Sequence, residues 1–260
     1  MSSYKFEVNK TFHIGLLSAM PQELGLILDN LKNIKENDFG DLKLYSGIWK
    51  ENEKNNVYIT TGWSGWGKVS AARATTRLCS SIYKDKEIDF ILFTGVAGAV
   101  NTTLKQWDIV IPDSLIQYDM DATPLFEKYT IPALNKKKLL PSKELHESLL
   151  FSLKKSKENG NLKEFGQIYN GLIGTGDQFI SDAEFLKKLS QEIEDIMAVE
   201  MEGAAFAQVA IQEKIDWIIL RVISDSADDS ASDEFSIFLN SYEKNSWKLI
   251  SSFLNSYFSV

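Results

Sequence analysis

The sequence predicts an α/β fold, a single domain of three layers in which helices cover both faces of a mixed, mostly parallel central sheet. Short apolar runs of strand length alternate with stretches whose apolar residues recur at helical spacing. The run Ile88–Phe93 is apolar on both faces, as is typical of a central parallel strand. Turns are short and no domain boundary is marked, so we expect the 260 residues to form one domain, with a core at about 12–258 and an N-terminal extension at 1–11.

The composition excludes several classes of function. Hydrophobic residues make up 44% of the chain and charged residues 25%, which argues against disorder. The formal net charge of −8 argues against a nucleic-acid partner, because a nucleic-acid surface usually needs a basic face. One cysteine, Cys79, and two histidines, His13 and His146, are too few for a disulfide framework or a zinc site. We therefore expect no metal.

We also expect no membrane partner. The apolar run His13–Met20 is too short for a signal core and continues into Gln22 and Glu23. No stretch approaches the about 20 apolar residues that are needed to cross a bilayer. The chain is therefore expected to be cytoplasmic.

The first part of the chain predicts two helices and at least three strands. Phe12–Leu17 is a buried first strand, and Pro21 suits the start of the helix that follows. The apolar positions of that helix are Leu24, Leu26, Ile27 and Leu31. Asp41–Trp49 and Asn56–Thr61 alternate apolar and polar residues, as in an antiparallel pair. A second helix then places on its pattern Val69, Ala72, Thr76, Cys79 and Ile82.

Between that pair and the second helix lies a glycine-rich loop, Gly62–Val69. Its glycines permit a tight turn and close approach of the backbone to a ligand. Its spacing matches neither the dinucleotide fingerprint nor a P-loop, because Lys68 is followed by a valine instead of Ser or Thr. No cofactor is therefore expected.

The middle of the chain predicts two more strand ends and a long loop. Ile88–Phe93 is followed by the small residues of Thr94–Val100, which let a flat ligand approach the backbone. Trp107–Ile111 is a further strand, which we expect Pro112 to break. Tyr118–Pro132 begins a stretch without periodicity that continues to Pro141, and long loops in compact domains are often functional.

The remaining expected elements surround a stretch that is rich in acids. They are a helix over Ser142–Lys157, a strand over Phe165–Ile173, a helix capped by Ser181 or Asp182 and ending near Leu189, and a closing helix from Asp233 to about Phe258.

The acid-rich stretch, Ala198–Asp228, organises the chemistry. Glu200 and Glu202 precede a helix at Gly203–Ile211, and the strand Trp217–Ile223 ends on Ser224 and Asp225. Ligands of open α/β sheets bind at the ends of strands, and a helix start supplies unpaired N–H groups. A carboxyl group at the end of a buried strand is half out of water, so its pKa can be raised enough for proton donation.

Three acids therefore form the candidate catalytic set: Glu23, Glu202 and Asp225. No Ser/His/Asp triad, metal cluster or cofactor fingerprint accompanies them. Acids without a metal suit reactions that pass through a cation, and glycoside hydrolysis shows how two carboxyl groups divide such work. Cleavage of an N-ribosidic bond is one reaction of this kind.

Six motifs in order resemble the nucleoside phosphorylase/nucleosidase superfamily, and within it the 5′-methylthioadenosine/S-adenosylhomocysteine nucleosidases. They are Ala19–Glu23 (AMPQE), Gly65–Val69 (GWGKV), Thr94–Gly98 (TGVAG), Thr175–Ile180 (TGDQFI), Val199–Glu202 (VEME) and Arg221–Asp228 (RVISDSAD). The resemblance covers about Phe12 to Phe235 and implies a nucleoside phosphorylase-like fold.

The resemblance also implies roles in hydrolysis of 5′-methylthioadenosine and S-adenosylhomocysteine to adenine and the 5′-thio-ribose. Asp225 would protonate the five-membered ring of adenine, and Ser224 would orient it. Glu23 would position and deprotonate the attacking water, and Glu202 would hold the ribose hydroxyls. The remaining substrate-binding residues would be Met201 against the sugar, Phe179 stacked on adenine, the Ile180 backbone at its edge, and Glu200, Ala97, Gly98, Met20, Trp66 and Arg221.

Three alternatives remain open. Phosphorylases of the same superfamily carry arginines near the first loop and before the TGxAG-like turn. Here Glu23 would repel phosphate, and no arginine lies between Arg77 and Thr94, so hydrolysis is favoured. A nucleosidase for another adenine or hypoxanthine nucleoside, such as futalosine, and a non-catalytic relative are the other two.

The chain departs from the family pattern in the pocket for the 5′ substituent. Trp66 stands where the family often has isoleucine, and Ser232 stands where it often has phenylalanine. The family closes its site with a loop from a neighbouring subunit, which here corresponds to Tyr118–Pro132, with Phe126 and Pro132 across the interface. We therefore expect a homodimer whose only other partner is the nucleoside.

Overall fold

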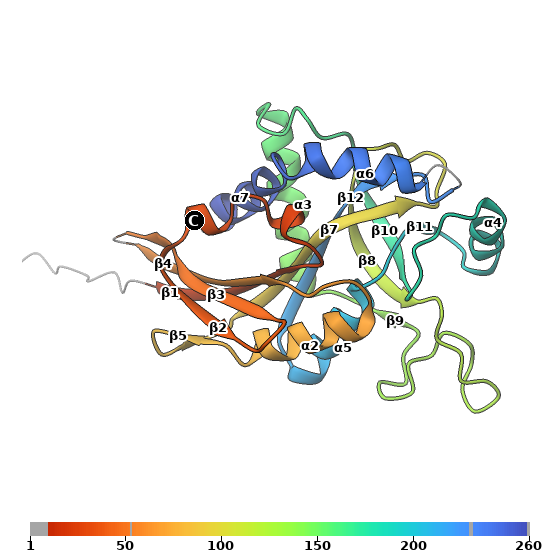
Figure 1. The fold of residues 1–260 in the computed structure, drawn as a ribbon, viewed down its shortest axis with the longest axis horizontal. Helices are drawn as coiled ribbons and strands as arrows, with labels where there is room; N and C mark the ends of the chain where they lie inside the picture. The colour runs from red at the N-terminus through yellow and green to blue at the C-terminus, as the bar shows by residue number, and fades with distance from the viewer. Residues whose placement is uncertain (1–9, 53, 229–230, 259–260) are drawn as a thin grey trace, which may run out of the picture.

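A computed structural model describes residues 10–52, 54–228 and 231–258, and shows a large mixed sheet with helices on both faces (Figure 1). Ten of its strands form the sheet: β1 (Lys10–Ser18), β2 (Lys32–Asp38), β3 (Lys43–Glu51), β4 (Asn55–Trp63), β7 (Phe90–Ala99), β8 (Ile109–Gln117), β9 (Lys138–Leu139), β10 (Ile168–Thr175), β11 (Ile196–Glu200) and β12 (Asp216–Asp225). β5 (Ile82–Tyr83) and β6 (Lys86–Glu87) form a separate hairpin. The α/β prediction is confirmed.

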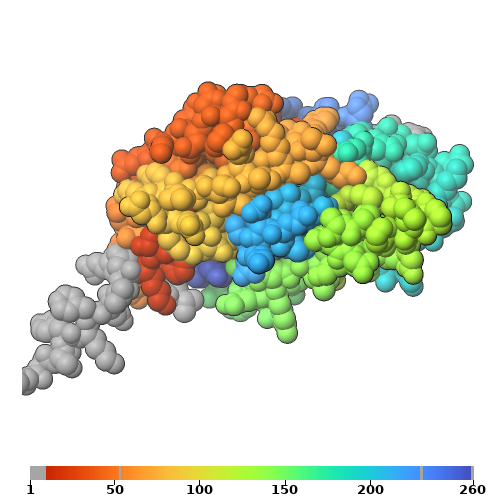
Figure 2. Space-filling model, turned by 90° about the horizontal axis from the view of Figure 1, so that it is seen from below, coloured from red at the N-terminus to blue at the C-terminus, as the bar shows by residue number. Residues whose placement is uncertain are grey.

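The helices of the described residues lie mostly in two layers. They are α1 (Pro21–Leu24), α2 (Lys68–Cys79), α3 (Lys143–Glu158), α4 (Ala183–Glu192), α5 (Gly203–Glu213), α6 (Ala231–Tyr242) and α7 (Ser246–Tyr257). In Figure 1, α2 and α5 lie together below the sheet, and α3, α6 and α7 lie above it. Seen from below in Figure 2, α5 is exposed between α2 and the segment that follows β8. Within the described residues, no helix has the length and apolar character that a bilayer crossing needs.

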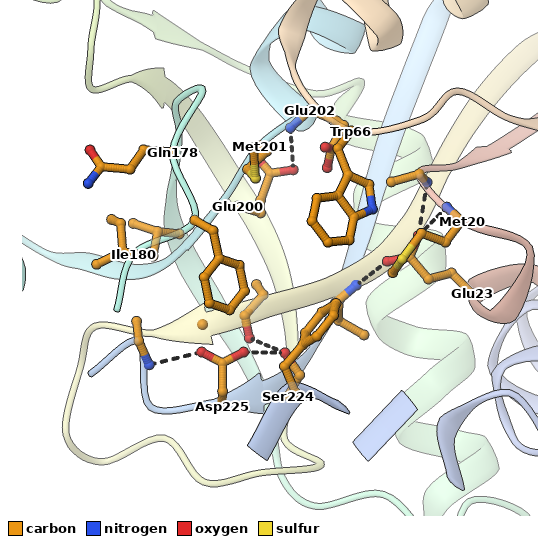
Figure 3. Close-up of a pocket in the computed structure, with 18 residues that line it drawn as sticks. Met20, Glu23, Trp66, Gln178, Ile180, Glu200, Met201, Glu202, Ser224 and Asp225 are labelled. Carbon is orange, nitrogen blue, oxygen red and sulfur yellow. Dashed lines mark hydrogen bonds between the residues drawn. The ribbon is translucent and has the colours of Figure 1, made fainter. Parts of the chain in front are cut away.

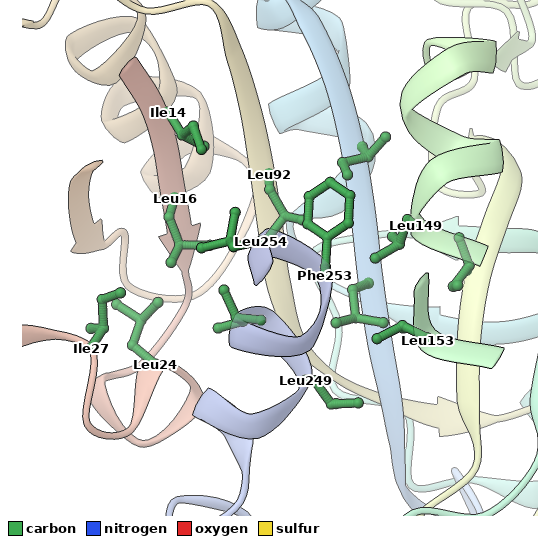
Figure 4. Packing of buried hydrophobic residues seen from close by; sticks show 14 of the residues in the cluster. Ile14, Leu16, Leu24, Ile27, Leu92, Leu149, Leu153, Leu249, Phe253 and Leu254 are labelled. Carbon is green, nitrogen blue, oxygen red and sulfur yellow. The ribbon is translucent and has the colours of Figure 1, made fainter. Parts of the chain in front are cut away.

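Strand β7 shows how the alternation of side chains builds a core on each face. Phe90 and Leu92 point to the side of α7 and α3, whereas Ile91 and Phe93 point to α2 and α5. In the first core, Leu92 packs with Ile14 and Leu16 of β1, with Leu149 and Leu153 of α3 and with Phe253 and Leu254 of α7 (Figure 4). A central strand that is buried on both faces reads as a continuous apolar run, as predicted.

The strand order is β11-β10-β8-β12-β7-β1-β4-β3-β2, and most of the paired length is parallel. β11 pairs with β10 and also, antiparallel, with β7, so five strands close into a ring within the sheet. β1, β7 and β12 run parallel, and their carboxyl ends therefore lie at one edge. Ligand sites of α/β sheets form at such an edge.

Two helix predictions were wrong near the ends of the chain. The helix that begins at Pro21 ends at Leu24, because Gly25 has a φ of 55° and the chain turns there. A 3-10 turn, Leu28–Asn30, follows between the buried residues Ile27 and Leu31, and Leu26 is 55% exposed. The closing helix is two helices, α6 and α7, because the chain turns between them.

Two further predictions need correction in the middle of the chain. The second helix, α2, ends at Cys79 and buries Ala71, Ala74, Thr75 and Leu78, while Val69 and Ile82 are exposed. β8 continues through Pro112 to Gln117, because the pairing with β10 shifts register beside the proline. A bulge tolerates a residue that lacks an N–H donor, so Pro112 does not end the strand.

Candidate active site

A pocket opens where β1, β7 and β12 end, and it contains all three candidate catalytic acids (Figure 3). Asp225 and Ser224 lie on one side of it and Glu23 and Met20 on another. The full lining is Ala19, Met20, Glu23, Trp66, Val96, Ala97, Gly98, Gln178, Phe179, Ile180, Val199, Glu200, Met201, Glu202, Ser224, Asp225, Ala227 and Phe235. Segments far apart in the sequence thus meet in one cavity.

Asp225 owes its position to a bulge at the end of β12. Ser224 and Asp225 together face Gly98 of β7, and a bulge of this kind turns a side chain out of its expected direction. The carboxylate accepts hydrogen bonds from Ser224 Oγ at 2.6 Å and from the Ala227 N–H at 2.9 Å. Burial raises the pKa of Asp225, although these two donors lower it in part. The group is thus suited to hold a proton and release it.

Glu23 lies in the first turn of α1, and three backbone N–H groups hold its carboxylate. Oε2 accepts from the N–H groups of Ala19 and Met20, and Oε1 accepts from the Val96 N–H, all at 2.9 Å. Burial raises the pKa of Glu23, and the Arg221 guanidinium and the three N–H donors lower it only in part. A carboxylate with a raised pKa is a stronger base than an exposed one.

Glu202 stands at the start of α5. Its Oε1 accepts a hydrogen bond from the Gly67 N–H at 2.8 Å, which joins it to the glycine-rich loop. Burial raises the pKa of Glu202, and the neighbouring carboxylate of Glu200 raises it further. Met201 lines the pocket between these two acids.

Beneath these acids lies a buried ion pair. Arg221 Nη2 donates to Glu200 Oε2, and the Arg221 side chain is only 1% exposed. Glu200 also accepts from the Gly203 N–H at 2.7 Å and from the Thr175 hydroxyl. The Arg221 guanidinium lies 4.6 Å from the ring centre of Phe93. The pair therefore fixes the ends of β10, β11 and β12 against one another.

The pocket is closed on its outer side by aromatic rings. Phe235 of α6 lies edge-on to Phe179, with 5.6 Å between ring centres, and edge-on to Trp66 at 6.1 Å. Trp66 is 52% exposed and Phe179 36%, so both retain free ring surface. Exposed aromatic surface beside a pocket is suited to a flat, apolar ligand.

Comparison with known proteins assigns the chain to a family. The model of the Phosphorylase superfamily matches residues 13–255. A 5′-methylthioadenosine/S-adenosylhomocysteine nucleosidase of Buchnera aphidicola is 34% identical over 223 residues, which cover 85% of this chain and 87% of that protein. The chain belongs to this nucleosidase family.

Solved structures of the family share the fold. The nucleosidase of Neisseria meningitidis, in complex with methylthio-immucillin-A, has a TM-score of 0.81 at 28% identity and covers 94% of this chain and 99% of its own. The nucleosidase of Colwellia psychrerythraea, in complex with adenine, has a TM-score of 0.79 at 30% identity, with coverage of 94% and 95%. The resemblance inferred from the six motifs is thus confirmed, as is the fold that it implied.

Most of the predicted site residues lie together, but three do not line the pocket. Arg221 lies behind Glu200, and Phe126 and Pro132 lie outside the lining. Pro132 is exposed in the segment after β8, and Phe126 is half-buried there. Among the described residues no group of three or more His, Cys, Asp or Glu side chains could hold a metal ion.

Sequence reasoning missed several lining residues: Ala19, Val96, Gln178, Val199, Ala227 and Phe235. The first five lie within or beside the recognised motifs, so their position next to a motif was the available signal. Phe235 comes from the last quarter of the chain and reaches the pocket only because α6 packs against β12. Its place after two acids at a helix start predicts a helix but no pocket.

Gly98 provides the first test of this geometry. A Cβ at this position would lie 2.8 Å from the Ala227 Cβ and 2.9 Å from Asp225 Oδ1, so Gly98→Ala must displace the acid. Because small displacements of groups that act on a substrate are costly, we expect kcat for nucleoside hydrolysis to fall about tenfold or more while the chain still folds. Steady-state kinetics together with a melting temperature would check this, and an unchanged kcat would show that Asp225 tolerates the shift.

Proposed function

We propose that the protein hydrolyses the N-ribosidic bond of 5′-methylthioadenosine and S-adenosylhomocysteine, releasing adenine and the 5′-thio-ribose. One observation carries the proposal: two buried carboxyl groups with raised pKa values, Asp225 and Glu23, face one pocket from different sides. The curated relatives bear the name of this activity, and solved relatives bind methylthio-immucillin-A or adenine.

Asp225 is the proposed general acid. Its proton passes to the five-membered ring of adenine as the bond to the ribose breaks, so the base leaves as a neutral molecule. Ser224 donates to Asp225 Oδ2 and holds the carboxyl group in one orientation. The bond electrons leave with the adenine, and the ribose develops oxocarbenium character.

Glu23 is the proposed general base. Its two oxygens are held by three backbone N–H groups, so the carboxylate has a fixed direction. It removes a proton from the water that attacks the ribose carbon. Glu202 accepts hydrogen bonds from the ribose hydroxyls, and Met201 packs against the sugar. The negative charge of Glu23 stabilises the cationic ribose.

The adenine lies between the outer aromatic rings and the end of β7. Phe179 supplies a ring face for stacking, and the small residues Ala97 and Gly98 let the base approach the backbone. The main-chain N–H and C=O of Ile180 read its edge, and such a donor and acceptor pair distinguishes adenine from hypoxanthine. Trp66 and Met20 lie on the side of Glu23 and Glu202 in Figure 3, which is the side proposed for the sugar.

Phosphorolysis is the second candidate, and the charges at the site disfavour it. Glu23 lines the pocket and must be ionised to act as the base, so its negative charge would repel a phosphate bound there. The nearby cation, Arg221, is already engaged by Glu200 and lies behind the lining. Water is the nucleophile that fits this environment.

We further propose that the protein is a cytoplasmic homodimer, with the segment Tyr118–Pro132 at the interface. Leu125 of this segment is 84% exposed, which suits burial against a second copy. Sedimentation should give twice the mass of the chain, and a fully active monomer would contradict the dimer.

The direct test is adenine release from 5′-methylthioadenosine by the purified protein in phosphate-free buffer. We expect release at a rate that does not change when phosphate is added. Release that depends on phosphate would move the protein to the phosphorylases and overturn the role of Glu23. Release from futalosine alone would assign it to a different nucleoside.

A further inference from the structure

We propose that Lys68, Asp119 and Asp177 form a clasp that holds two loops of the pocket, the glycine-rich loop at 62–69 and the loop after β10 at 176–180, in their binding positions. Lys68 and Asp177 are then positioning residues for the nucleoside. None of the three side chains lines the pocket. The inference rests on the function proposed above, and it concerns substrate binding more than the chemical step.

The clasp is a closed ring of three hydrogen bonds. The Lys68 N–H donates to Asp177 Oδ1 at 2.7 Å, and the Asp177 N–H donates to Asp119 Oδ2 at 3.0 Å. Lys68 Nζ completes the ring by donating to Asp119 Oδ1 at 2.6 Å. Each residue thus contacts the other two, and none can move without stretching a bond to its neighbours.

The ring joins three segments that leave different strands. Lys68 begins α2 just after β4, Asp119 follows the end of β8, and Asp177 follows the end of β10. β8 and β10 pair in the sheet, so Asp119 and Asp177 rest on a rigid base. The ring therefore fastens the glycine-rich loop to the edge of the sheet.

Asp177 also supplies a helix cap from a distant part of the chain. The N-cap of α2 is Gly67, which has no side chain, and the first turn of α2 contains no acid. The Asp177 carboxylate binds the Lys68 N–H and so takes the place of a capping side chain. A Cβ on Gly67 would come within 3.0 Å of this carboxylate, so the fit is tight.

The positions of these residues link the ring to the substrate. Trp66 precedes Lys68 by two residues, and Phe179 follows Asp177 by two, and both side chains line the pocket. The Gly67 N–H holds Glu202 Oε1 at 2.8 Å. Loss of these three hydrogen bonds would therefore free Trp66 on one loop and Phe179 on the other, and it would also release the Gly67 N–H that anchors Glu202.

The test compares Lys68→Met and Asp177→Ala with wild type, using adenine release for kcat and KM. We expect KM to rise about tenfold in both, with a smaller change in kcat, because the ring orders groups that bind the nucleoside. Hydrogen exchange should quicken in peptides that span 65–68 and 176–180. Asp177→Asn should keep KM near wild type, because its carboxamide oxygen still accepts from the Lys68 N–H.

Lys248→Met is the matched control. It breaks another lysine–carboxylate pair, with Glu164 at 2.5 Å, on the helix layer away from the pocket. KM should not change in this variant.

Two outcomes would overturn the clasp. One is an unchanged KM with unchanged exchange in Lys68→Met and Asp177→Ala. The other is a lower melting temperature with an unchanged KM, which would make the ring a stabilising feature only. A wild-type protein that releases no adenine would instead count against the proposed function, and the exchange of the two loops would still decide whether the ring holds them.

Discussion

Asp225→Asn is expected to lower kcat for adenine release by about 100- to 10,000-fold, the range that general acid catalysis contributes. Asparagine has nearly the same shape and can keep the hydrogen bond from the Ala227 N–H, but its carboxamide is not acidic enough to protonate the leaving base. Kinetics with 5′-methylthioadenosine would measure the loss. Asp113→Asn makes the same chemical change at an exposed position of β8 and should leave kcat unchanged.

The pH dependence follows from the same group. Asp225 donates only while it is protonated, so kcat/KM should fall as the pH rises through its raised pKa. The Ser224 hydroxyl donates to the carboxylate and lowers this pKa, so Ser224→Ala should move the alkaline limb of the profile to higher pH. A limb that stays in place, or an Asp225→Asn enzyme of normal activity, would show that another group is the acid.

Glu23→Gln should lower kcat by a similar factor of about 100 to 10,000. A carboxamide cannot accept the proton of the attacking water. It also has one acceptor oxygen where Glu23 uses both, so its NH₂ group must face either the Val96 N–H or the N–H groups of Ala19 and Met20. Single-turnover kinetics would separate slow chemistry from weak binding.

The control and the pH dependence of Glu23 can be measured in the same way. Glu144→Gln, at an exposed position of α3, should behave like wild type. The base must be ionised, so kcat/KM of the wild type should fall as the pH drops through the raised pKa of Glu23. If Glu23→Gln hydrolyses the substrate at a normal rate, the base is a different group, and Glu202 is then the next to test.

The sequence predicted the central elements well because their patterns are local. The apolar residues within Ile88–Phe93 and Gly203–Ile223 predict by themselves that these segments are buried. The structure places β7, α5 and β12 there. The prediction of a longer helix from Pro21 failed because one residue, Gly25, turns the chain against the start of α7, where a Cβ would meet Ser246 Oγ at 2.5 Å. No apolar pattern reports such a contact.

The site shows the same limit. The acids could be found because each ends a strand or begins a helix, and the motifs then suggested their roles. The pairing of Arg221 with Glu200, the bond from Gly67 to Glu202 and the arrival of Phe235 join segments that are remote in the sequence. These contacts depend on how strands and helices are ordered in space, which one sequence alone does not reveal.

The buried pair beneath the pocket limits how the protein can change over generations. Loss of either Glu200 or Arg221 would remove the main ionic partner of the other residue in the core, at a cost of about 3–5 kcal/mol. A single substitution at either position therefore gives a less stable protein, and only simultaneous replacement of both residues avoids that loss of stability. By contrast, Trp66 and Phe235 lie at the rim, where they pack against each other edge-on and take no part in an ion pair. We therefore expect substrate preference to change by substitution of Trp66 and Phe235 at the rim, while Glu200 and Arg221 beneath the pocket are kept together.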